Sequence, residues 1–366
     1  MRGTRGHVAI IKRRPARRVA CAATLLVCVL AAPHTSSAQT QTDRRSQERL
    51  EMRRGEGEAL LSLADAAMGG RASSDFSIGW TNDFFKAQTG TFVPFTVTID
   101  RSALTAADAL MYVRATRRDA AAAAIPIRYP FDIIFPVALS APPGQPLRIT
   151  RGFAVAPGDY DVYVALRERA ADLRGSDRRL KGAVLKQPLT VPDFWTGELA
   201  TSTVMLADRI EPVTAAVVGD DVLERPYVIG ANEVHRAAGT AFKKNRELIV
   251  VFLIYNPAVS PDKSFDIEVD YHLFRKDAAG PTEPADEADH PPVRPGEAYV
   301  TRTTPQRFQP AAMGANFDPA SGPILAGQGI LLSSFRVGEY RLGITVRDLV
   351  SRKSLSRDII FKVVGS

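Results

Sequence analysis

The chain has 366 residues with 47 bases and 40 acids, and seven of these bases, with no acid, lie in residues 1–38. The remaining 328 residues are therefore neutral overall, and they contain no cysteine because Cys21 and Cys28 also lie in that first segment. This neutrality argues against a nucleic-acid partner, and the absence of thiols excludes disulfides, a cysteine nucleophile and a thiolate zinc site beyond residue 38.

Residues 1–38 have the layout of a secretory signal peptide. Basic residues come first, an apolar run of 14 residues follows at 19–32, and the small residues Ser36 and Ala38 end the segment. The apolar run is too short to span a bilayer comfortably. We therefore expect an exported chain, periplasmic or secreted, with no membrane span in its mature form. An uncleaved N-terminal anchor is the alternative.

Residues 39–75 are polar and predict one short helix. Leu60, Leu61, Ala64 and Met68 recur at helical spacing, and a pair of glycines then offers a stop. This amphipathic helix could dock on the body of the protein, bind a partner or fray in solvent, and we expect it either to dock or to fray.

From Phe76 onward the pattern predicts an all-β fold. Short runs of β-branched and aromatic residues alternate with proline and glycine turns. The clearest candidate strands of the first half are FVPFTVTID, ALMYVRA, FDIIFPVAL, YDVYVAL and AVLKQPLTV. Those of the second half are RELIVVFLIY, FDIEVDYHLF, YRLGITV and RDIIFKVV.

The two halves repeat the same markers in the same order. A Phe-Lys pair lies ten residues before Phe95 and again ten residues before Phe252, and an aspartate follows these phenylalanines after 24 and 25 residues. The strands GDYDVYVAL and GEYRLGITV come later, and each runs on to a final carboxylate. We therefore predict two copies of one module, at residues 76–193 and 194–366, the second with long loops at 278–298 and 305–329.

The repeated strand carries a resemblance to a known class of fold. Tyr160 and Tyr340 each follow a glycine-containing corner and begin a strand with one apolar face. This arrangement resembles the tyrosine corner of immunoglobulin-like and fibronectin-like sandwiches, in which the tyrosine hydroxyl bonds back to the upstream backbone. Val162 and Leu342 stand where antibody domains have a cysteine. The resemblance implies two tandem immunoglobulin-like β-sandwiches, as in exported bacterial proteins that end in such modules.

A second resemblance is confined to five residues. The stretch GWTND at 79–83 is similar to the signature of the GWxTD family, but Asn82 stands where that family has threonine.

The histidines and acids beyond residue 38 do not form a recognised catalytic motif. His235, His272 and His290 are the histidines there, and we interpret His272 as an exposed or satisfied strand residue. His290 follows three acids in a proline-rich loop, which we interpret as a solvated loop rather than a loose divalent-metal site. The sequence has no G-x-S-x-G, H-E-x-x-H, Walker or EF-hand motif. We therefore assign no catalytic, cofactor or metal residue and expect a protein that is not an enzyme.

Two features are candidate binding sites. The loop at 167–182 holds six bases and three acids and would join the last two strands of the first module, where sandwiches often bind ligands. It is either a site for an anionic ligand or a solvated hairpin tip. Trp80 and Trp195 could each stack on a sugar ring, although packing across a domain boundary is at least as good an explanation. The predicted loop ligands are Arg174, Arg178, Arg179 and Lys181.

These observations favour an exported, non-enzymatic protein that binds or assembles through loops and strand edges. Its partner would be a protein or an envelope glycan, with anionic character if the basic loop binds it. A carbohydrate-binding accessory protein for cell-envelope processing is the alternative, and a hydrolase that uses carboxylates is a third, weaker one.

We expect cleavage after Ala38, because basic, apolar and small-residue zones follow one another in the order of a signal peptide. N-terminal sequencing of exported protein should begin at Gln39. Recovery of a membrane-embedded form that retains Met1 would contradict this prediction.

Overall fold

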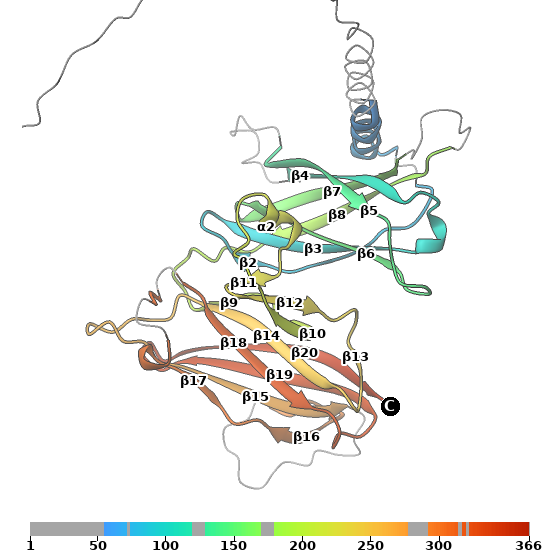
Figure 1. Ribbon diagram of the computed structural model, residues 1–366. Coiled ribbons are helices and arrows are strands. Elements are labelled where there is room, and N and C mark those ends of the chain that lie inside the picture. Colours follow the sequence, from blue (N-terminus) through green and yellow to red (C-terminus); the bar gives the residue numbers. More distant parts are fainter. Residues whose placement is uncertain are drawn as a thin grey trace, which may run out of the picture. The chain divides into compact units, whose positions relative to one another are not determined.

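The computed structural model describes residues 55–71, 74–118, 129–169, 179–276, 292–313, 317–319 and 322–365. All of them lie within one compact unit, Arg53–Ser366. Two β-sandwiches provide most of the regular structure (Figure 1), so the prediction of an all-β sandwich fold is confirmed. Across these described ranges, no helix has both the length and the apolar character needed to cross a bilayer. The expected signal peptide, residues 1–38, lies outside them.

The first sandwich has two four-stranded sheets. One contains β1 (Gly79–Asn82), β2 (Phe85–Lys86), β3 (Thr91–Ile99) and β6 (Leu147–Val155). The other has the order β5 (Phe131–Ala138), β4 (Asp108–Arg117), β7 (Gly158–Glu168) and β8 (Gly182–Val191). Alternate residues of β3, β4, β6 and β7 point between the sheets and form one apolar core, which includes Phe95 and Tyr160.

The second sandwich has two six-stranded sheets. One contains β9 (Ala200–Thr201), β10 (Met205–Pro212), β11 (Val228–Ile229), β12 (Asn232–Arg236), β14 (Glu247–Tyr255) and β18 (Ile324–Leu331). The other contains β13 (Ala241–Lys243), β15 (Ile267–Lys276), β16 (Glu297–Arg302), β17 (Gln306–Phe308), β19 (Gly338–Asp348) and β20 (Lys353–Val364). Short helices lie at α2 (Asp221–Glu224), η1 (Arg101–Ala103) and η3 (Pro310–Ala312).

Residues 55–68 form the predicted helix, and it docks rather than frays. Leu60 and Ala64 are fully buried against Tyr112 of β4 and Ala165 of β7, on the sheet face that points away from the core. Asp65 also pairs with the buried guanidinium of Arg114 at 2.5 Å. The helix therefore covers the outer face of this sheet.

Both tyrosine corners are formed. The hydroxyl of Tyr160 donates to the carbonyl oxygen of Ala156 at 2.9 Å, and that of Tyr340 donates to the carbonyl oxygen of Arg336 at 2.7 Å. Both corner glycines, two residues before the tyrosines, have positive φ angles of 140° and 154°, which favour glycine. The repeated Gly-x-Tyr pattern therefore encodes the same local geometry in β7 and β19.

The carboxylate at the end of each repeated strand has a structural role. Glu168 and Asp348 are each 1% exposed. Glu168 accepts backbone N–H groups from both neighbouring loops of the first sandwich, and Asp348 does the same in the second. The donors to Glu168 are Thr105, Ala106 and Lys181, and the donors to Asp348 are Ala258, Val350 and Ser351.

The predicted loop at 305–329 is wrong, because it contains β17 and most of β18. Gly327 and Gly329 suggested turns, yet Ile324, Ala326 and Ile330 alternate with them and are buried in the core. The glycines point to the other face, where they lie opposite Ile249 and Val251 in the register with β14. The loop predicted at 278–298 ends where β16 begins, at Glu297, and residues 278–291 lie outside the described ranges.

One pair of repeat markers differs between the modules. Phe85 and Phe242 each lie ten residues before the matching core phenylalanine. However, β2 pairs antiparallel with β3, whereas β13 pairs in parallel with β20 of the other sheet. Equal spacing therefore does not give equal pairing in the two modules. The aspartates at 119 and 277 lie outside the described residues.

We predict that Tyr160→Phe and Tyr340→Phe each destabilise the protein by about 1 kcal/mol, because each removes one hydrogen bond and keeps the packed ring. Urea unfolding of the two variants and the parent would measure this. An unchanged midpoint in both variants would mean that the corner bonds contribute no stability.

Candidate ligand-binding site

The two sandwiches share an apolar core where they meet. β14 is apolar on both faces: Val250 and Phe252 point into its own sandwich, whereas Val251, Leu253 and Tyr255 point outward. The outward residues pack with side chains from both modules, so β14 is buried on its two sides. This junction core contains Phe85, Phe194, Met205, Ala207, Tyr227, Val234, Val251, Leu253 and Tyr255.

A buried carboxylate fixes the contact at this junction. Asp83, between β1 and β2, is 1% exposed. One of its oxygens accepts the hydroxyl of Tyr227 at 2.6 Å and also pairs with the guanidinium of Arg236. Tyr227 and Arg236 come from the β11–β12 region of the second module. Because hydrogen bonds are directional, this cluster orients surfaces that apolar packing alone would leave free to slide.

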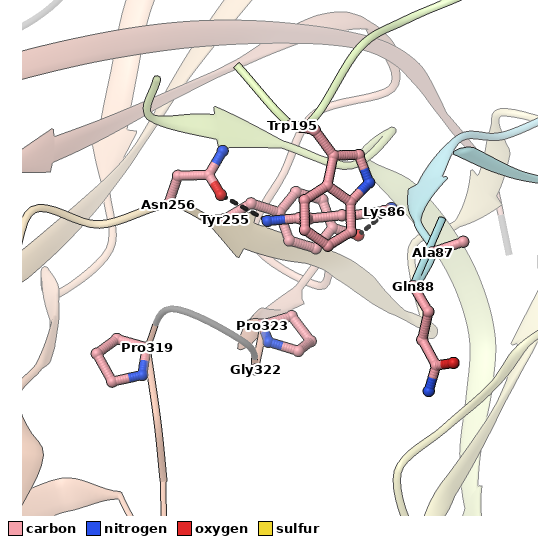
Figure 2. Close-up of a pocket in the computed structure, with 9 residues that line it drawn as sticks. All are labelled: Lys86, Ala87, Gln88, Trp195, Tyr255, Asn256, Pro319, Gly322 and Pro323. Carbon is pink, nitrogen blue, oxygen red and sulfur yellow. Dashed lines mark hydrogen bonds between the residues drawn. The ribbon is translucent and has the colours of Figure 1, made fainter. Parts of the chain in front are cut away.

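A hollow of about 370 Å³ opens beside the junction core (Figure 2). Its walls come from the turn after β2, the segment that joins β8 to β9, the end of β14 and the segment before β18. The lining residues are Lys86, Ala87, Gln88, Trp195, Tyr255, Asn256, Pro319, Gly322 and Pro323.

Trp195 presents an aromatic surface to this hollow. Its indole N–H donates to the carbonyl oxygen of Gly90 at 3.1 Å, and the ammonium of Lys86 lies 4.2 Å from the centre of its ring. The side chain is nevertheless 50% exposed. One edge and one face of the indole are thus held by the protein, while much of the ring remains accessible.

Asn256 connects three segments of the groove wall through its side-chain hydrogen bonds. Its backbone is left-handed, with φ of 55°, a conformation that asparagine tolerates better than most residues. Its side-chain amide donates to the carbonyl oxygens of Phe194 and Glu198, both at 2.9 Å, and its oxygen accepts the ammonium of Lys86 at 2.7 Å. The backbone N–H of Lys86 donates to the Tyr255 hydroxyl at 3.1 Å. The end of β14 therefore positions Lys86 and the segment that carries Trp195.

A second hollow, of about 310 Å³, continues the first. The two share Asn256 and Pro319 in their walls. We call them together the junction groove. The walls of the second hollow are Gly197, Leu199, Asn256, Pro257, Ala258, Val259, Pro319, Asp348, Ser351 and Lys353.

The two predicted tryptophans occupy different environments. Trp80 stacks on Phe95 with ring centres 4.5 Å apart and donates its N–H to Asn82 at 2.9 Å, so it caps the core of the first sandwich. It does not line the groove. Trp195 does. Sequence reasoning missed Lys86 and Asn256, and the Asn-Pro dipeptide directly after an apolar strand was the available signal for the second of these.

The described residues of the predicted basic loop do not line the groove. Arg174 and Arg178 lie outside the described residues. Arg179 pairs with Asp75 at 3.0 Å, and the ammonium of Lys181 donates to the carbonyl oxygen of Ala103. Both residues precede β8, whereas Trp195 follows it. The ten residues of this strand place its ends about 30 Å apart.

The histidines do not cluster with acids in the described part of the chain. His235 pairs with Glu211 at 2.8 Å on the surface, whereas His272 is buried, at 1% exposed. His290 and its acidic neighbours fall outside the described residues. Within these ranges, no group of three histidine, aspartate or glutamate side chains is placed to hold a metal ion.

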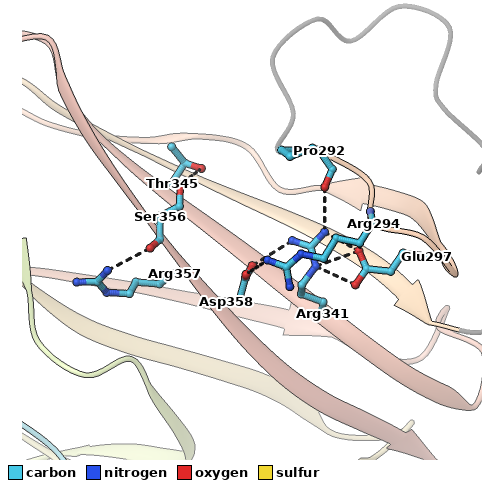
Figure 3. Close-up of polar contacts among 8 residues, drawn as sticks. All are labelled: Pro292, Arg294, Glu297, Arg341, Thr345, Ser356, Arg357 and Asp358. Carbon is cyan, nitrogen blue, oxygen red and sulfur yellow. Dashed lines mark hydrogen bonds and ion pairs between the residues drawn. The ribbon is translucent and has the colours of Figure 1, made fainter.

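A second charged cluster is buried on β19 (Figure 3). The guanidinium of Arg341, 1% exposed, donates to Glu297 at 2.6 to 3.0 Å, to Asp358 at 3.0 Å and to the carbonyl oxygen of Pro292 at 3.3 Å. It also lies 3.9 Å from the ring centre of Phe274. The donors of this guanidinium are therefore occupied by protein acceptors. The cluster attaches residues 292–297 to the sheet and does not offer a binding site.

Comparisons with known proteins give no family. No protein-family model and no curated protein sequence matches the chain. Similar solved structures include a red sea bream transglutaminase, 13% identical over 82% of this chain and 33% of its own, with a TM-score of 0.21. A Salmonella alpha-2-macroglobulin is 10% identical over 81% of this chain and 15% of its own, also with a TM-score of 0.21. An Escherichia coli alpha-2-macroglobulin activated by porcine elastase is 10% identical over 80% and 24%, with the same TM-score. The chain spans about a third of these proteins or less, and likeness at this score supports no functional conclusion.

The Arg341 cluster predicts an acid-sensitive contribution to stability. Burial alone would raise the pKa of Glu297, but the guanidinium of Arg341 outweighs it and holds that pKa below its usual value. A depressed pKa in the folded state stabilises the protein above the unfolded value of about 4.3, and this stabilisation is lost as the pH falls through the folded pKa. Glu297→Gln should therefore lose about 3 kcal/mol at pH 7 and a smaller amount at pH 3.

Urea unfolding at the two pH values would measure this difference. Glu339→Gln is a matched control on the same face, because Glu339 forms a half-exposed pair with Lys276 and should cost less than about 1 kcal/mol. A deficit in Glu297→Gln that is equal at both pH values would contradict the prediction.

Proposed function

We propose that this protein is a non-catalytic binding protein whose junction groove holds a carbohydrate. The observation that carries the proposal is Trp195, which is fixed by the Gly90 carbonyl and by Lys86 yet stays 50% exposed beside a hollow of about 370 Å³. Exposing a large aromatic ring to water is unfavourable, so a ligand that covers it would be stabilised by burial.

The chemistry of the hollow suits a sugar ring. The apolar C–H face of a pyranose can pack on an indole, and its hydroxyls need donors and acceptors at the ring's rim. Gln88 supplies an exposed amide, and the ammonium of Lys86 supplies a donor. The opposite wall is formed by two prolines and a glycine, Pro319, Pro323 and Gly322. These residues have few side-chain rotamers that a ligand would have to immobilise.

The carboxylates of the groove favour binding over hydrolysis. A glycosidase needs a pair of free carboxyl groups across the sugar. Among the described lining residues, Asp348 is the sole carboxylate, and it is 1% exposed and bonded to three backbone N–H groups. A binding role therefore explains the groove with fewer assumptions than the carboxylate-dependent hydrolase.

Export belongs to the same proposal. The N-terminal segment has the layout of a signal peptide, and glycans of the cell envelope are accessible to a periplasmic or secreted protein. A cleaved leader would release the two sandwiches and their groove into that compartment.

We predict that a glycan array will identify oligosaccharides bound by the parent protein and that Trp195→Ala will weaken their binding at least tenfold. The loss of ring stacking, worth roughly 0.5–1.5 kcal/mol beyond burial of its area, gives this magnitude. Val218→Ala, at a side chain that is 69% exposed elsewhere, is the control and should bind like the parent.

Fluorescence gives a direct measure at the site, since the chain has two tryptophans. Trp80→Phe keeps an aromatic ring on Phe95 and leaves Trp195 as the reporter, whose quenching by acrylamide should fall when the oligosaccharide binds. If Trp195→Ala binds glycans as tightly as the parent does, the groove is not the carbohydrate site.

A further inference from the structure

We infer that the ligand of the junction groove is an acidic carbohydrate whose carboxylate pairs with Lys86. This inference rests on the proposed function and adds the chemical class of the sugar. Its basis is the position of a partly buried ammonium on the wall of the hollow, beside the exposed indole of Trp195.

The ammonium of Lys86 has a free direction for a ligand. An ammonium carries three donor hydrogens. One donates to Asn256 at 2.7 Å, and the ring of Trp195, 4.2 Å away, takes up another side of the group. Asn256 cannot turn away, because its N–H groups are both used on backbone carbonyls. Among the described residues the third donor has no partner, and Lys86 lines the hollow.

The charge of Lys86 is not offset by the described groove residues. Its described contacts, with Asn256 and Trp195, are neutral, and no ion pair to a carboxylate occurs for it within the ranges that the structure describes. By contrast, Lys353 in the second hollow pairs with Glu198 at 2.5 Å, and Asp348 is satisfied by backbone donors. Lys86 therefore gives the first hollow a net positive charge.

An incoming carboxylate would compensate this charge. Burial lowers the pKa of Lys86, which shows that the charged form is less well solvated there than in water. A carboxylate on the ligand would restore the missing solvation with a charge-assisted hydrogen bond, which a neutral hydroxyl does less well. A uronic acid stacked on Trp195 combines a flat apolar face with such a carboxylate on its rim, and so matches both features of the wall.

The test uses one pair of probes that differ in charge. Tetragalacturonate and its methyl ester have the same rings, and titration calorimetry of the full chain measures both. We expect the acid to bind about tenfold more tightly than the ester, as one charge-assisted hydrogen bond allows. Lys86→Met keeps the aliphatic stem beside Trp195 and should abolish this preference, so that the acid and the ester bind this variant with equal affinity. Lys86→Arg should retain part of it.

Lys353→Met is the matched control, because it removes a groove lysine that is already paired, and it should retain the tenfold preference. Equal affinities of the parent for acid and ester, both lost in Trp195→Ala, would overturn the inference and leave the proposed function standing. A preference for the acid that survives Lys86→Met would also overturn it. If neither probe nor any neutral or acidic glycan of an array binds, both the inference and the proposed function fail.

Discussion

The burial of β14 on both faces is the constraint on which the candidate site depends. One face completes the core of the second sandwich and the other forms the core of the junction. Each aliphatic side chain buried in this way contributes on the order of 1.5–3 kcal/mol, so the two cores are coupled through one strand. Tyr255 and Asn256 lie at the end of that strand and hold Lys86 and the segment of Trp195. The groove is thus an extension of the junction core rather than a feature of a mobile loop.

Apolar packing alone would not give the groove a defined geometry, since the hydrophobic effect has no direction. Asp83 supplies direction by pairing with Tyr227 and Arg236 across the junction. A buried ion pair contributes little net stability after desolvation, but it penalises arrangements that leave its charge unpaired. Asn256 plays a comparable part with neutral groups. The junction therefore combines a non-directional source of stability with a few polar contacts that select one arrangement.

The sequence predicted the features that depend on local pattern. Period-two strands and the corner tyrosines follow from residues close to one another, and the structure contains them. It failed at β18, where glycines on the outer face concealed a strand, and at β13, which pairs with β20 whereas its counterpart β2 pairs with β3. The groove was only half predicted, through Trp195. Lys86 and Asn256 lie 170 positions apart, and only the docking of two modules unites them. The signal for that docking was the unbroken apolar run of β14, which indicates burial on both faces.

The divergence of the two modules bears on why the proposed ligand site lies at the junction. In the first, the docked helix at 55–68 covers the outer face of the sheet that contains β7. In the second, Arg341 follows the corner tyrosine Tyr340 on β19. Its contacts with Glu297 and Pro292 attach residues 292–297 to the sheet that contains β19. Asp161, the counterpart of Arg341, instead pairs with Lys186 at 2.8 Å at the surface. Both modules thus cover a sheet face that a sandwich could offer to a partner, each by a different device. The contact between modules leaves Trp195 exposed beside the ammonium of Lys86, which has no partner carboxylate among the described residues. A ligand could cover the exposed ring and pair with this charge at the same time.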